Sequence, residues 1–564
     1  ALEYWIPSEL KESINAVFHT VHTPPHFKPK YRQRLPKLNP HSIFPFIDTP
    51  FKTHLRADHI TQLMKNQNDR TNSVELDQIG SIVNIAFLDS TYKISSNIGS
   101  SKLNQSVFET SDEYFVPSDL TLFQSKNNAV SQKAISIGNH SIASCTGANT
   151  DCGEGNLDIQ FIMGVAQKTA SIYWWVSDAS DPFVTWIQDV AAESNPPQAN
   201  SISWGEIETF LSSSVVTAWE TEASKLAGRG VTITVSSGDD GAPNANGANV
   251  CLCSQNHGYN PSFPATSQWV TAVGATMGPE TGSAEVVCSS SNNGVITSGG
   301  GFSVKVSRPS WQNNAVNYYL TAAAASTSPP TSGYNSAGRG YPDVSLIGVN
   351  YQIYLDGAPA IVYGTSCSSP VFAAFVSLVN AARLKNNLTA VGFINPTLYS
   401  VGYNNTIGVS NIYNATFNDV TSGNTKCCAS GSSPSCCSSG FTALKGWDPT
   451  TGWGSIDYTE FAAIFQVAAS YNGTASSNSS GGNGTSLSSL QIGIIVLVIL
   501  IALSFVYFAY NCFCRPKPMP QSDLGNVIMV QASLPTPAYV QTQVQNPSYV
   551  QNPTVVVARP PPRA

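Results

Sequence analysis

Two strands and one helix stand out from the pattern of apolar and polar positions in the middle of the chain. Val231 to Ser236 is a β-branched run that ends before Asp239, which is typical of a strand buried on both faces of a sheet. Residues 199–203 predict a second strand. Because sites in open α/β sheets form at the carboxyl ends of strands, Asp239 is a candidate site residue. A buried helix is predicted by apolar residues at helical spacing: Leu157, Phe161, Ile162 and Val165.

A further helix is predicted over the apolar stretch 371–381, and the turn before it begins at Gly364. Small residues let the backbone bend sharply there, and we place Pro370 in the first helical turn, where its missing N–H costs nothing. Ser366 then lies at a turn from strand to helix and is a candidate catalytic nucleophile. An ordinary turn followed by a proline cap has the same pattern.

A serine nucleophile needs a base, and histidine is the usual one. Six of the eight histidines precede residue 60, and neither His140 nor His257 has a recognisable catalytic setting. Glu154 and Asp158 are four residues apart, which puts both carboxylates on one face of the predicted helix, where they repel unless they share a proton or a hydrogen bond. An ordinary solvated acidic face has the same spacing, and Asp239 could equally be a turn-forming residue.

Together these segments resemble the sedolisin family of serine-carboxyl peptidases, and the tripeptidyl peptidase branch most of all. The resemblance covers roughly residues 80 to 465, with many motifs in the same order, which chance would not produce. The further matching motifs are Ser203-Trp204-Gly205, Ser298 to Ser303, Gly338 to Ser345, Asn418 to Gly423 and Gly446 to Gly454.

The resemblance implies a subtilisin-like α/β fold, with a mostly parallel sheet flanked by helices. It implies catalytic roles for four residues: Ser366 as nucleophile, Glu154 as base, Asp158 as the acid that orients the base, and Asp239 as the acid at the oxyanion hole. It implies substrate binding by Ser203, Trp204, Gly205, Gly299 and Gly300. Because a carboxylate base works best at low ambient pH, we expect an acid-active peptidase.

The expected reaction is the release of tripeptides from free N-termini of peptides or unfolded proteins. An acid endopeptidase is the alternative within enzymes, because it would share the catalytic residues. Outside enzymes, the chain could be a catalytically idle surface or sorting receptor, although the intact catalytic set argues against this. Cys367 is a competing nucleophile, but a papain-like site needs a histidine partner that we cannot place.

Asp419 and Asp448 lie in two loops near the end of the resemblance. They read either as turn aspartates or as ligands of Ca²⁺, which takes six to eight oxygen atoms. The resemblance favours one Ca²⁺ ion, with the carbonyls of Val420, Leu444 and Gly446 as further ligands. Leu444 departs from the family, which usually has glycine there, and this weakens the register more than the site.

The composition agrees with a lumenal enzyme. The 564 residues are 42% hydrophobic and 11% charged, with a net charge of −7, so the chain offers no basic patch for nucleic acid.

Ten of the twelve cysteines precede residue 490, an even number that suits an oxidising compartment. The spacing of Cys145 and Cys152 predicts a local disulfide, and Cys427, Cys428, Cys436 and Cys437 predict a stapled loop of unknown pairing. Predicted N-glycosylation sites are Asn104, Asn139, Asn387, Asn404, Asn414, Asn472, Asn478 and Asn483.

The C-terminal part changes character three times. Residues 469–489 predict a glycosylated Ser/Gly/Asn stalk, and 490–511 a transmembrane helix around the uncharged run Ile492 to Tyr510, although a buried core helix has similar composition. Arg515 and Lys517 follow this run, so residues 512–564 should form a cytosolic tail without a packed core. We therefore expect a single-pass type I protein, facing the endosomal or lysosomal lumen or exposed at the plasma membrane.

The tail and the N-terminus carry two weaker signals. Asn546 to Tyr549 resembles signals that endocytic adaptors bind. Residues 1–50 resemble the end of the family's inhibitory propeptide, which predicts a zymogen, and the peptidase domain is expected over 51–468. The chain begins without an initiator Met or signal peptide, so we expect a longer precursor.

Overall fold

The computed structural model describes residues 81–145, 151–177, 181–246, 249–325, 332–409 and 416–465. The predicted propeptide remnant, stalk, transmembrane helix and tail therefore lie outside the described residues. Within these ranges, one helix is long and apolar enough to cross a membrane, and 83% of its apolar window is buried. It is α8 (Thr365–Lys385), and this degree of burial is typical of the core helix of a folded domain.

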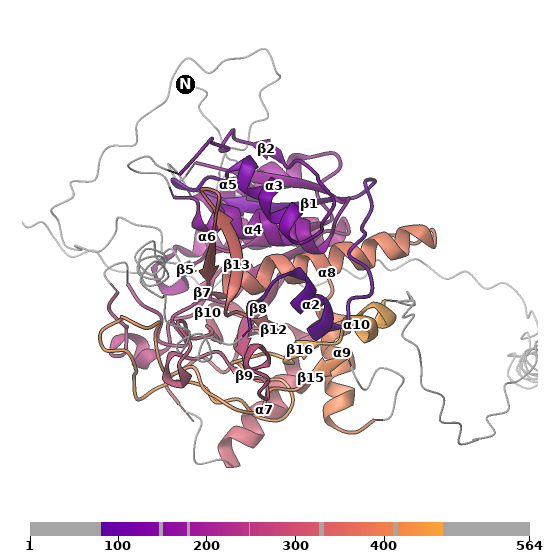
Figure 1. Ribbon diagram of the computed structural model, residues 1–564. Coiled ribbons are helices and arrows are strands. Elements are labelled where there is room, and N and C mark those ends of the chain that lie inside the picture. Colours follow the sequence, from indigo (N-terminus) through magenta and orange to yellow (C-terminus); the bar gives the residue numbers. More distant parts are fainter. Residues whose placement is uncertain are drawn as a thin grey trace, which may run out of the picture. The chain divides into compact units, whose positions relative to one another are not determined.

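A mostly parallel sheet forms the centre of the fold (Figure 1). The neighbouring strands β12, β8, β6, β4, β1, β3 and β2 all pair in parallel, and β9 (Val286–Val287) pairs with β8 in antiparallel fashion. This confirms the predicted sheet. In the same order, the parallel strands are Val344–Ile347, Thr271–Met277, Thr232–Ser236, Ala199–Ile202, Asn104–Glu109, Ala170–Trp175 and Ile135–Ile137.

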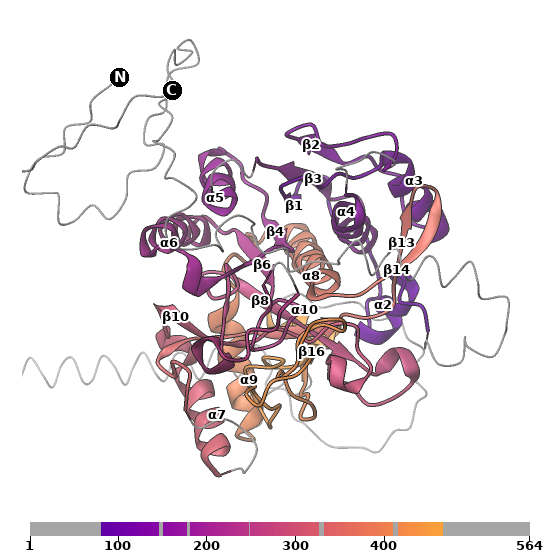
Figure 2. The same ribbon diagram turned by 90° about the vertical axis from the view of Figure 1, so that its left-hand side faces the viewer.

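Helices cover both faces of this sheet (Figure 2). On one face α8 packs against α4 (Gly153–Val165), and α3 (Pro117–Lys126) packs against α4. On the other face α5 (Pro182–Ala192) and α6 (Ser213–Gly228) pack together around Trp186 and Trp219, which are fully buried. Each face has its own apolar core. Because both faces are covered, the central strands β4 and β6 are buried along their whole length, and even their polar residues Asn200 and Thr234 are fully buried.

Shorter elements surround the sheet. The remaining α-helices are α2 (Ile85–Tyr92), α7 (Asn313–Ala325), α9 (Asn395–Thr406) and α10 (Tyr458–Ile464). The remaining strands form antiparallel pairs: β5 (Glu206–Ile207) with β7 (Ser262–Phe263), β10 (Gly301–Ser307) with β11 (Gly338–Tyr341), β13 (Tyr351–Leu355) with β14 (Ala358–Val362), and β15 (Phe417–Asn418) with β16 (Ser455–Ile456).

The helix that was predicted over residues 371–381 begins earlier than expected. α8 begins at Thr365, so Pro370 lies inside the helix and not in its first turn. That prediction was wrong because the nucleophile turn itself is helical. The N–H of Thr365 donates to Oδ1 of Asp239, and the helix continues through the small residues that follow. The missing N–H of Pro370 leaves the carbonyl of Ser366 without its usual helical donor.

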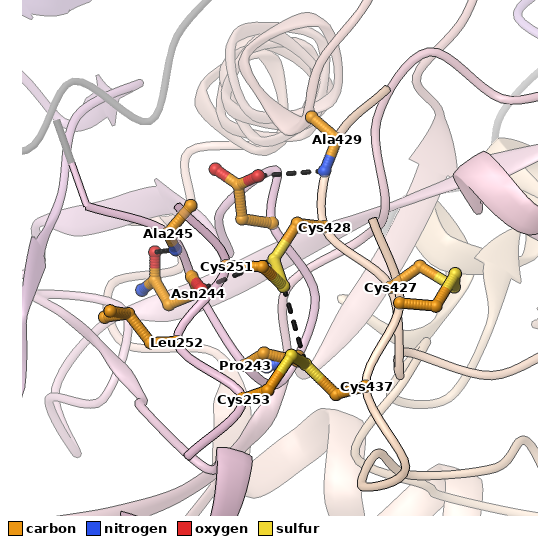
Figure 3. Close-up of a disulfide and its surroundings, with 12 residues drawn as sticks. Pro243, Asn244, Ala245, Cys251, Leu252, Cys253, Cys427, Cys428, Ala429 and Cys437 are labelled. Carbon is orange, nitrogen blue, oxygen red and sulfur yellow. Dashed lines mark hydrogen bonds between the residues drawn. A yellow bond between two sulfur atoms is a disulfide. The ribbon is translucent and has the colours of Figure 1, made fainter. Parts of the chain in front are cut away.

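Eight cysteines of the described region form four disulfides. The predicted bridge Cys145–Cys152 is present, and the predicted stapled loop contains Cys427–Cys436. The loop is also tied to the segment after Asp239 by the pairs Cys251–Cys428 and Cys253–Cys437 (Figure 3). Cys288 and Cys367 are free and buried, so the even count of cysteines did not mean that all of them pair.

Four of the predicted glycosylation sites can be placed. Asn139 and Asn387 are exposed, as a glycosylated side chain must be. Asn404 is half-buried on α9, and Asn104 is half-buried as the first residue of β1. The other four predicted sites lie outside the described residues: Asn414, Asn472, Asn478 and Asn483.

Candidate active site

Ser366 lies in the first turn of α8, directly after the turn that follows β14. Gly364 has a φ of +154°, which L residues rarely adopt, and a Cβ atom there would lie 3.1 Å from Oδ2 of Asp239. The Ser366 hydroxyl is buried and donates to the carbonyl oxygen of Ser203 at 3.4 Å. The predicted strand-to-helix turn is therefore present, and it sets the hydroxyl against the carboxyl end of β4.

The predicted pair Glu154 and Asp158 lies in α4, which packs against α8. The two residues are 1% and 0% exposed, so the alternative of a solvated acidic face is excluded. Burial raises the pKa of both carboxyls well above the usual range, and for Glu154 the charge of Asp158 adds to this effect. Both oxygens of Glu154 lack a hydrogen bond of full geometry in the described region, although the Ser366 hydroxyl is close enough to lower the pKa of Glu154.

Ser203 connects the nucleophile to the acidic pair. Its hydroxyl donates to Oδ1 of Asp158 at 2.8 Å, while its carbonyl accepts from Ser366. Ser203, which directly follows β4, therefore fixes α4 and α8 relative to each other at the site. The sequence grouped Ser203 with substrate binding, whereas the structure shows that its side chain also orients Asp158.

Two further buried acids, Glu109 and Glu113, lie next to this pair and were missed in the sequence. Glu109 ends β1 and accepts from Nε1 of Trp204 at 2.9 Å, and Glu113 accepts from the N–H of Gly155 at 3.3 Å. Both are fully buried, and both raise the pKa of Glu154. The available signal was the charge of Glu109 at the carboxyl end of an apolar strand, a place where site residues gather.

Asp239 lies just beyond the carboxyl end of β6 and faces the turn before Ser366. Both the N–H and the hydroxyl of Thr365 donate to Oδ1 of Asp239 at 2.8 Å. Its carboxyl group is therefore bonded to the residue before Ser366, and not only to its own turn. The N–H of Gly238 also donates to the Thr365 hydroxyl at 3.1 Å.

Two of the three predicted substrate-binding glycines, Gly299 and Gly300, pack closely against backbone near the Asp239 turn. The N–H of Gly299 donates to the carbonyl of Gly238 at 2.7 Å, and a Cβ atom at Gly299 would lie 2.2 Å from the carbonyl oxygen of Ser237. A Cβ atom at Gly300 would lie 2.1 Å from the carbonyl oxygen of Pro449. Close backbone packing thus explains both glycines, and a contact with substrate remains a prediction.

The competing nucleophile Cys367 is poorly placed for attack. Its thiol is fully buried, and burial together with the charges of Glu154 and Asp239 raises its pKa well above the usual range. A thiolate is the reactive form of cysteine, so this environment suppresses it. In the described part of the chain, neither His140 nor His257 hydrogen-bonds to Cys367 or Ser366; His140 stacks on Trp175 with ring centroids 3.5 Å apart.

The two predicted calcium loops lie against each other. The N–H of Gly446 donates to Oδ2 of Asp419 at 2.7 Å, and the N–H of Leu444 donates to Oδ2 of Asp448 at 2.8 Å. Burial raises the pKa of Asp448 to about 7, although several hydrogen bonds oppose this. Among the described residues, no N–H or hydroxyl donates to the carbonyls of Val420, Leu444 or Gly446. A buried carboxylate beside carbonyls without donors is a donor set that suits Ca²⁺.

Curated relatives of the chain are peptidases by name. It is 35% identical to the tripeptidyl-peptidase 1 of Bos taurus over 314 residues, 54% of this chain and 50% of the relative. It is 31% identical to that of Mus musculus over 446 residues, 73% of each, and 33% identical to physarolisin of Physarum polycephalum over 390 residues, 63% of each. The chain thus spans about half the length of the first of these relatives. Comparison with models of known protein families finds no match.

A solved structure supports the same relationship. Pseudomonas sedolisin, a serine-carboxyl proteinase complexed with two molecules of pseudo-iodotyrostatin, matches with a TM-score of 0.50 and 25% sequence identity. The match covers 69% of this chain and 98% of that chain. Nearly all of that protein therefore has a counterpart here.

Proposed function

The chain belongs to the sedolisin family of serine-carboxyl peptidases, in the tripeptidyl-peptidase branch, and from this premise we propose that it hydrolyses peptides at acid pH with Ser366 as nucleophile. One observation carries the proposal. A buried serine hydroxyl, the pair Glu154 and Asp158, and Asp239 come together from three separate elements around the end of β4. Three buried acids beside a buried serine hydroxyl are typical of an active site.

In the proposed reaction, the Ser366 oxygen attacks the scissile carbonyl carbon while Glu154 accepts the hydroxyl proton. The same proton then passes to the leaving amine as the C–N bond breaks, and water hydrolyses the acyl-enzyme by the reverse roles. Asp158, held by Ser203, orients Glu154. Asp239 would donate a hydrogen bond to the developing oxyanion, which is worth about 3 kcal/mol for one preorganised donor.

The electrostatics support an acid enzyme. Two carboxyls that are buried side by side cannot easily both ionise, so Glu154 and Asp158 share one proton over a range of pH. The Ser366 hydroxyl favours the charge on Glu154. The pair must have lost one proton while Asp239 keeps its own, and these opposite requirements give a bell-shaped pH profile.

Removal of tripeptides from free N-termini is the specificity that the relatives named tripeptidyl-peptidase 1 suggest. An acid endopeptidase remains the second candidate, because it would use the same catalytic residues. The test is to incubate the purified full chain at acid pH with one peptide in two forms, with a free and with an acetylated N-terminus. Cleavage of the free form in three-residue steps supports the tripeptidyl activity.

Matched variants decide whether the chain is an enzyme at all. Cleavage of both peptide forms would favour the endopeptidase, and cleavage of neither would favour the idle receptor. Ser366→Ala should abolish hydrolysis, whereas Cys367→Ala, at the next residue of the same helix, should retain it. The opposite pattern would show that the nucleophile is wrongly assigned.

We also propose one bound Ca²⁺ ion, held by the carboxylates of Asp419 and Asp448 and by the carbonyls of Val420, Leu444 and Gly446. The bond from the Leu444 N–H to Asp448 supports the register at the position where the sequence departs from the family. The ion would supply the positive charge that the buried Asp448 lacks among the described residues.

The place of action is proposed from the sequence. A carboxylate base suits an acidic compartment, and the run Ile492 to Tyr510 would anchor the chain with its peptidase domain on the lumenal or extracellular side. A C-terminal tag that antibody reaches outside intact cells would contradict this orientation. Unchanged distribution of a Tyr549→Ala variant would contradict only the adaptor signal in the tail.

A further inference from the structure

The segment from Ser203 to Glu206 connects the nucleophile to the rim of the sheet. The carbonyl of Ser203 accepts from Ser366, and Glu206 begins β5 three residues later. In the described part of the chain, the N–H and carbonyl of Gly205 make no hydrogen bond. An unbonded peptide group beside a nucleophile is available to pair with the backbone of an extended peptide.

The direction of such a peptide follows from the sheet. β4 ends at Ile202 and pairs on one side with β1 and on the other with β6, so its backbone has no free edge. A peptide whose scissile carbonyl lies at Ser366 can therefore pair with this segment only after the end of β4, and along it the peptide runs from Ser203 towards Glu206. Three extended residues span about 10 Å, and Glu206 likewise lies three residues along the chain from Ser203. The amino end of the third substrate residue then lies opposite Glu206.

Among the described residues, Glu206 is an acid without a partner. Its side chain is half-buried and makes no hydrogen bond or ion pair with any described residue. Burial raises the pKa of Glu206 to about 7, and the charge of Asp181 adds to this effect. Asp181 is itself engaged, because its Oδ1 accepts from the N–H of Val184 at the start of α5.

The neighbouring Glu208 shows the contrast within the same segment. Its carboxylate accepts from the hydroxyl of Ser303 and from the N–H of Val304, both at 2.6 Å, so it holds β10 in place. Glu206 accepts no such hydrogen bonds from the described residues, although the pairing of β5 with β7 fixes its backbone. A fixed, poorly solvated carboxyl group with an acidic neighbour has its strongest interaction with a cation.

We propose that Glu206 binds the free N-terminal ammonium group of the substrate and thereby determines cleavage after the third residue. This inference rests on the proposed peptidase function and names the residue that would set its specificity. The ammonium supplies the positive charge that the described protein residues do not, and it displaces any proton that Glu206 holds. An acetylated N-terminus, or a peptide that extends further in that direction, would leave the carboxylate without a cation.

The test combines two enzymes with two substrates. The substrates are a chromogenic tripeptide and its desamino analogue, in which hydrogen replaces the N-terminal ammonium, and the enzymes are the wild type and Glu206→Gln. We expect the wild type to prefer the free amine by about 10- to 100-fold in kcat/KM, mainly through KM, because hydrogen bonds to charged groups have this strength. The variant should lose this preference. Its kcat/KM for the desamino substrate should equal that of the wild type. This coupling isolates the pair from general effects on activity.

Glu193→Gln, an exposed acid after α5, is the matched control and should keep the full preference. Equal hydrolysis of both substrates by the wild type, or an undiminished preference in Glu206→Gln, would overturn the inference while leaving the peptidase function intact. Hydrolysis of neither substrate, nor of any longer peptide, by the wild type would instead overturn the proposed function. Should Glu206→Gln fail to fold, Glu206→Met serves as an apolar isostere with the same expected and contrary outcomes.

Discussion

The molecule buries carboxylates in two contrasting ways. Asp343 is fully buried and pairs with Nη2 of Arg339 at 2.5 Å, and it also accepts from the N–H of Ala272. Glu154 and Asp158 are buried as deeply, but the charges that act on Glu154 come from other carboxylates. Asp343 has a cationic partner and supports the fold. Glu154 and Asp158, in contrast, lie among carboxylates that repel them, next to a serine hydroxyl. Perturbed acids of the second kind are typical of active sites.

This contrast predicts that the two groups fail differently when they are changed. Glu154→Gln should lower kcat/KM by about three orders of magnitude or more, because the serine loses its base. The melting temperature should stay the same or rise, because a buried acid among acids is removed. Peptide hydrolysis at acid pH and thermal unfolding of the same preparation measure the two effects. Activity within about tenfold of the wild type would show that another residue acts as the base.

The opposite result is expected for the paired group. Arg339→Met should destabilise the domain by about 3–5 kcal/mol, because it leaves Asp343 buried and unpaired. Adding Asp343→Asn should recover part of this loss, and the residual folded enzyme should keep its pH profile. Denaturant unfolding measures the free energy. A single variant as stable as the wild type would mean that the ion pair is not what holds these two segments.

A bound Ca²⁺ ion would give the buried Asp448 a cationic partner, as Arg339 does for Asp343. Removing Ca²⁺ by chelation should destabilise the wild type, by about 3 kcal/mol if the free ion had been present at a hundred times its dissociation constant. Asp448→Ala should be destabilised already and should respond little to the chelator. Melting curves of a metal-containing preparation that do not change on chelation would remove the ion from the account.

The smallest expected effect is on the pH dependence of stability. The pKa values of Glu154 and Asp158 are raised in the folded state, so between the unfolded and folded pKa values the folded state binds more protons. Their contribution is full below about pH 4, the range of unfolded carboxyls, and is lost as the pH rises through the folded values.

The free energy of unfolding should therefore fall as the pH rises above about 4, by at most about 1.4 kcal/mol per pH unit for each proton. The carboxyl of Glu220, whose pKa is raised to about 7, adds to the same slope. In Glu154→Gln the decline should be shallower, because one of the two coupled acids is gone. An equally steep decline in the variant, followed by denaturant unfolding across this pH range, would mean that the pair does not titrate as described.

Much of this site could be predicted because its residues lie at the ends of strongly patterned elements. The strand before Asp239 and the helix that carries Glu154 were both evident from apolar periodicity, and Ser366 from its turn. What the sequence could not give was how these ends meet. Ser203 touches both Asp158 and Ser366, although the three come from segments far apart in the chain.

Residues whose role depends only on tertiary packing escaped prediction. Glu109 and Glu113 are separated in the chain from α4 by α3 and β2, and only burial against α4 makes them part of the acidic group. Pro370 was misplaced because the start of α8 is set by a bond from Thr365 to the distant Asp239. Disulfide pairing was likewise undetermined, since two of the bridges join segments more than 170 residues apart.

The central claim is that Ser366 is a nucleophile activated by Glu154, and covalent labelling tests it most directly. The purified chain is treated at acid pH with a fluorophosphonate, which phosphonylates activated serines, and is then digested and analysed by mass spectrometry. The account predicts an adduct on Ser366 that is lost in Glu154→Gln under the same conditions. An adduct on Cys367, or labelling of Ser366 at the same rate in Glu154→Gln, would contradict it.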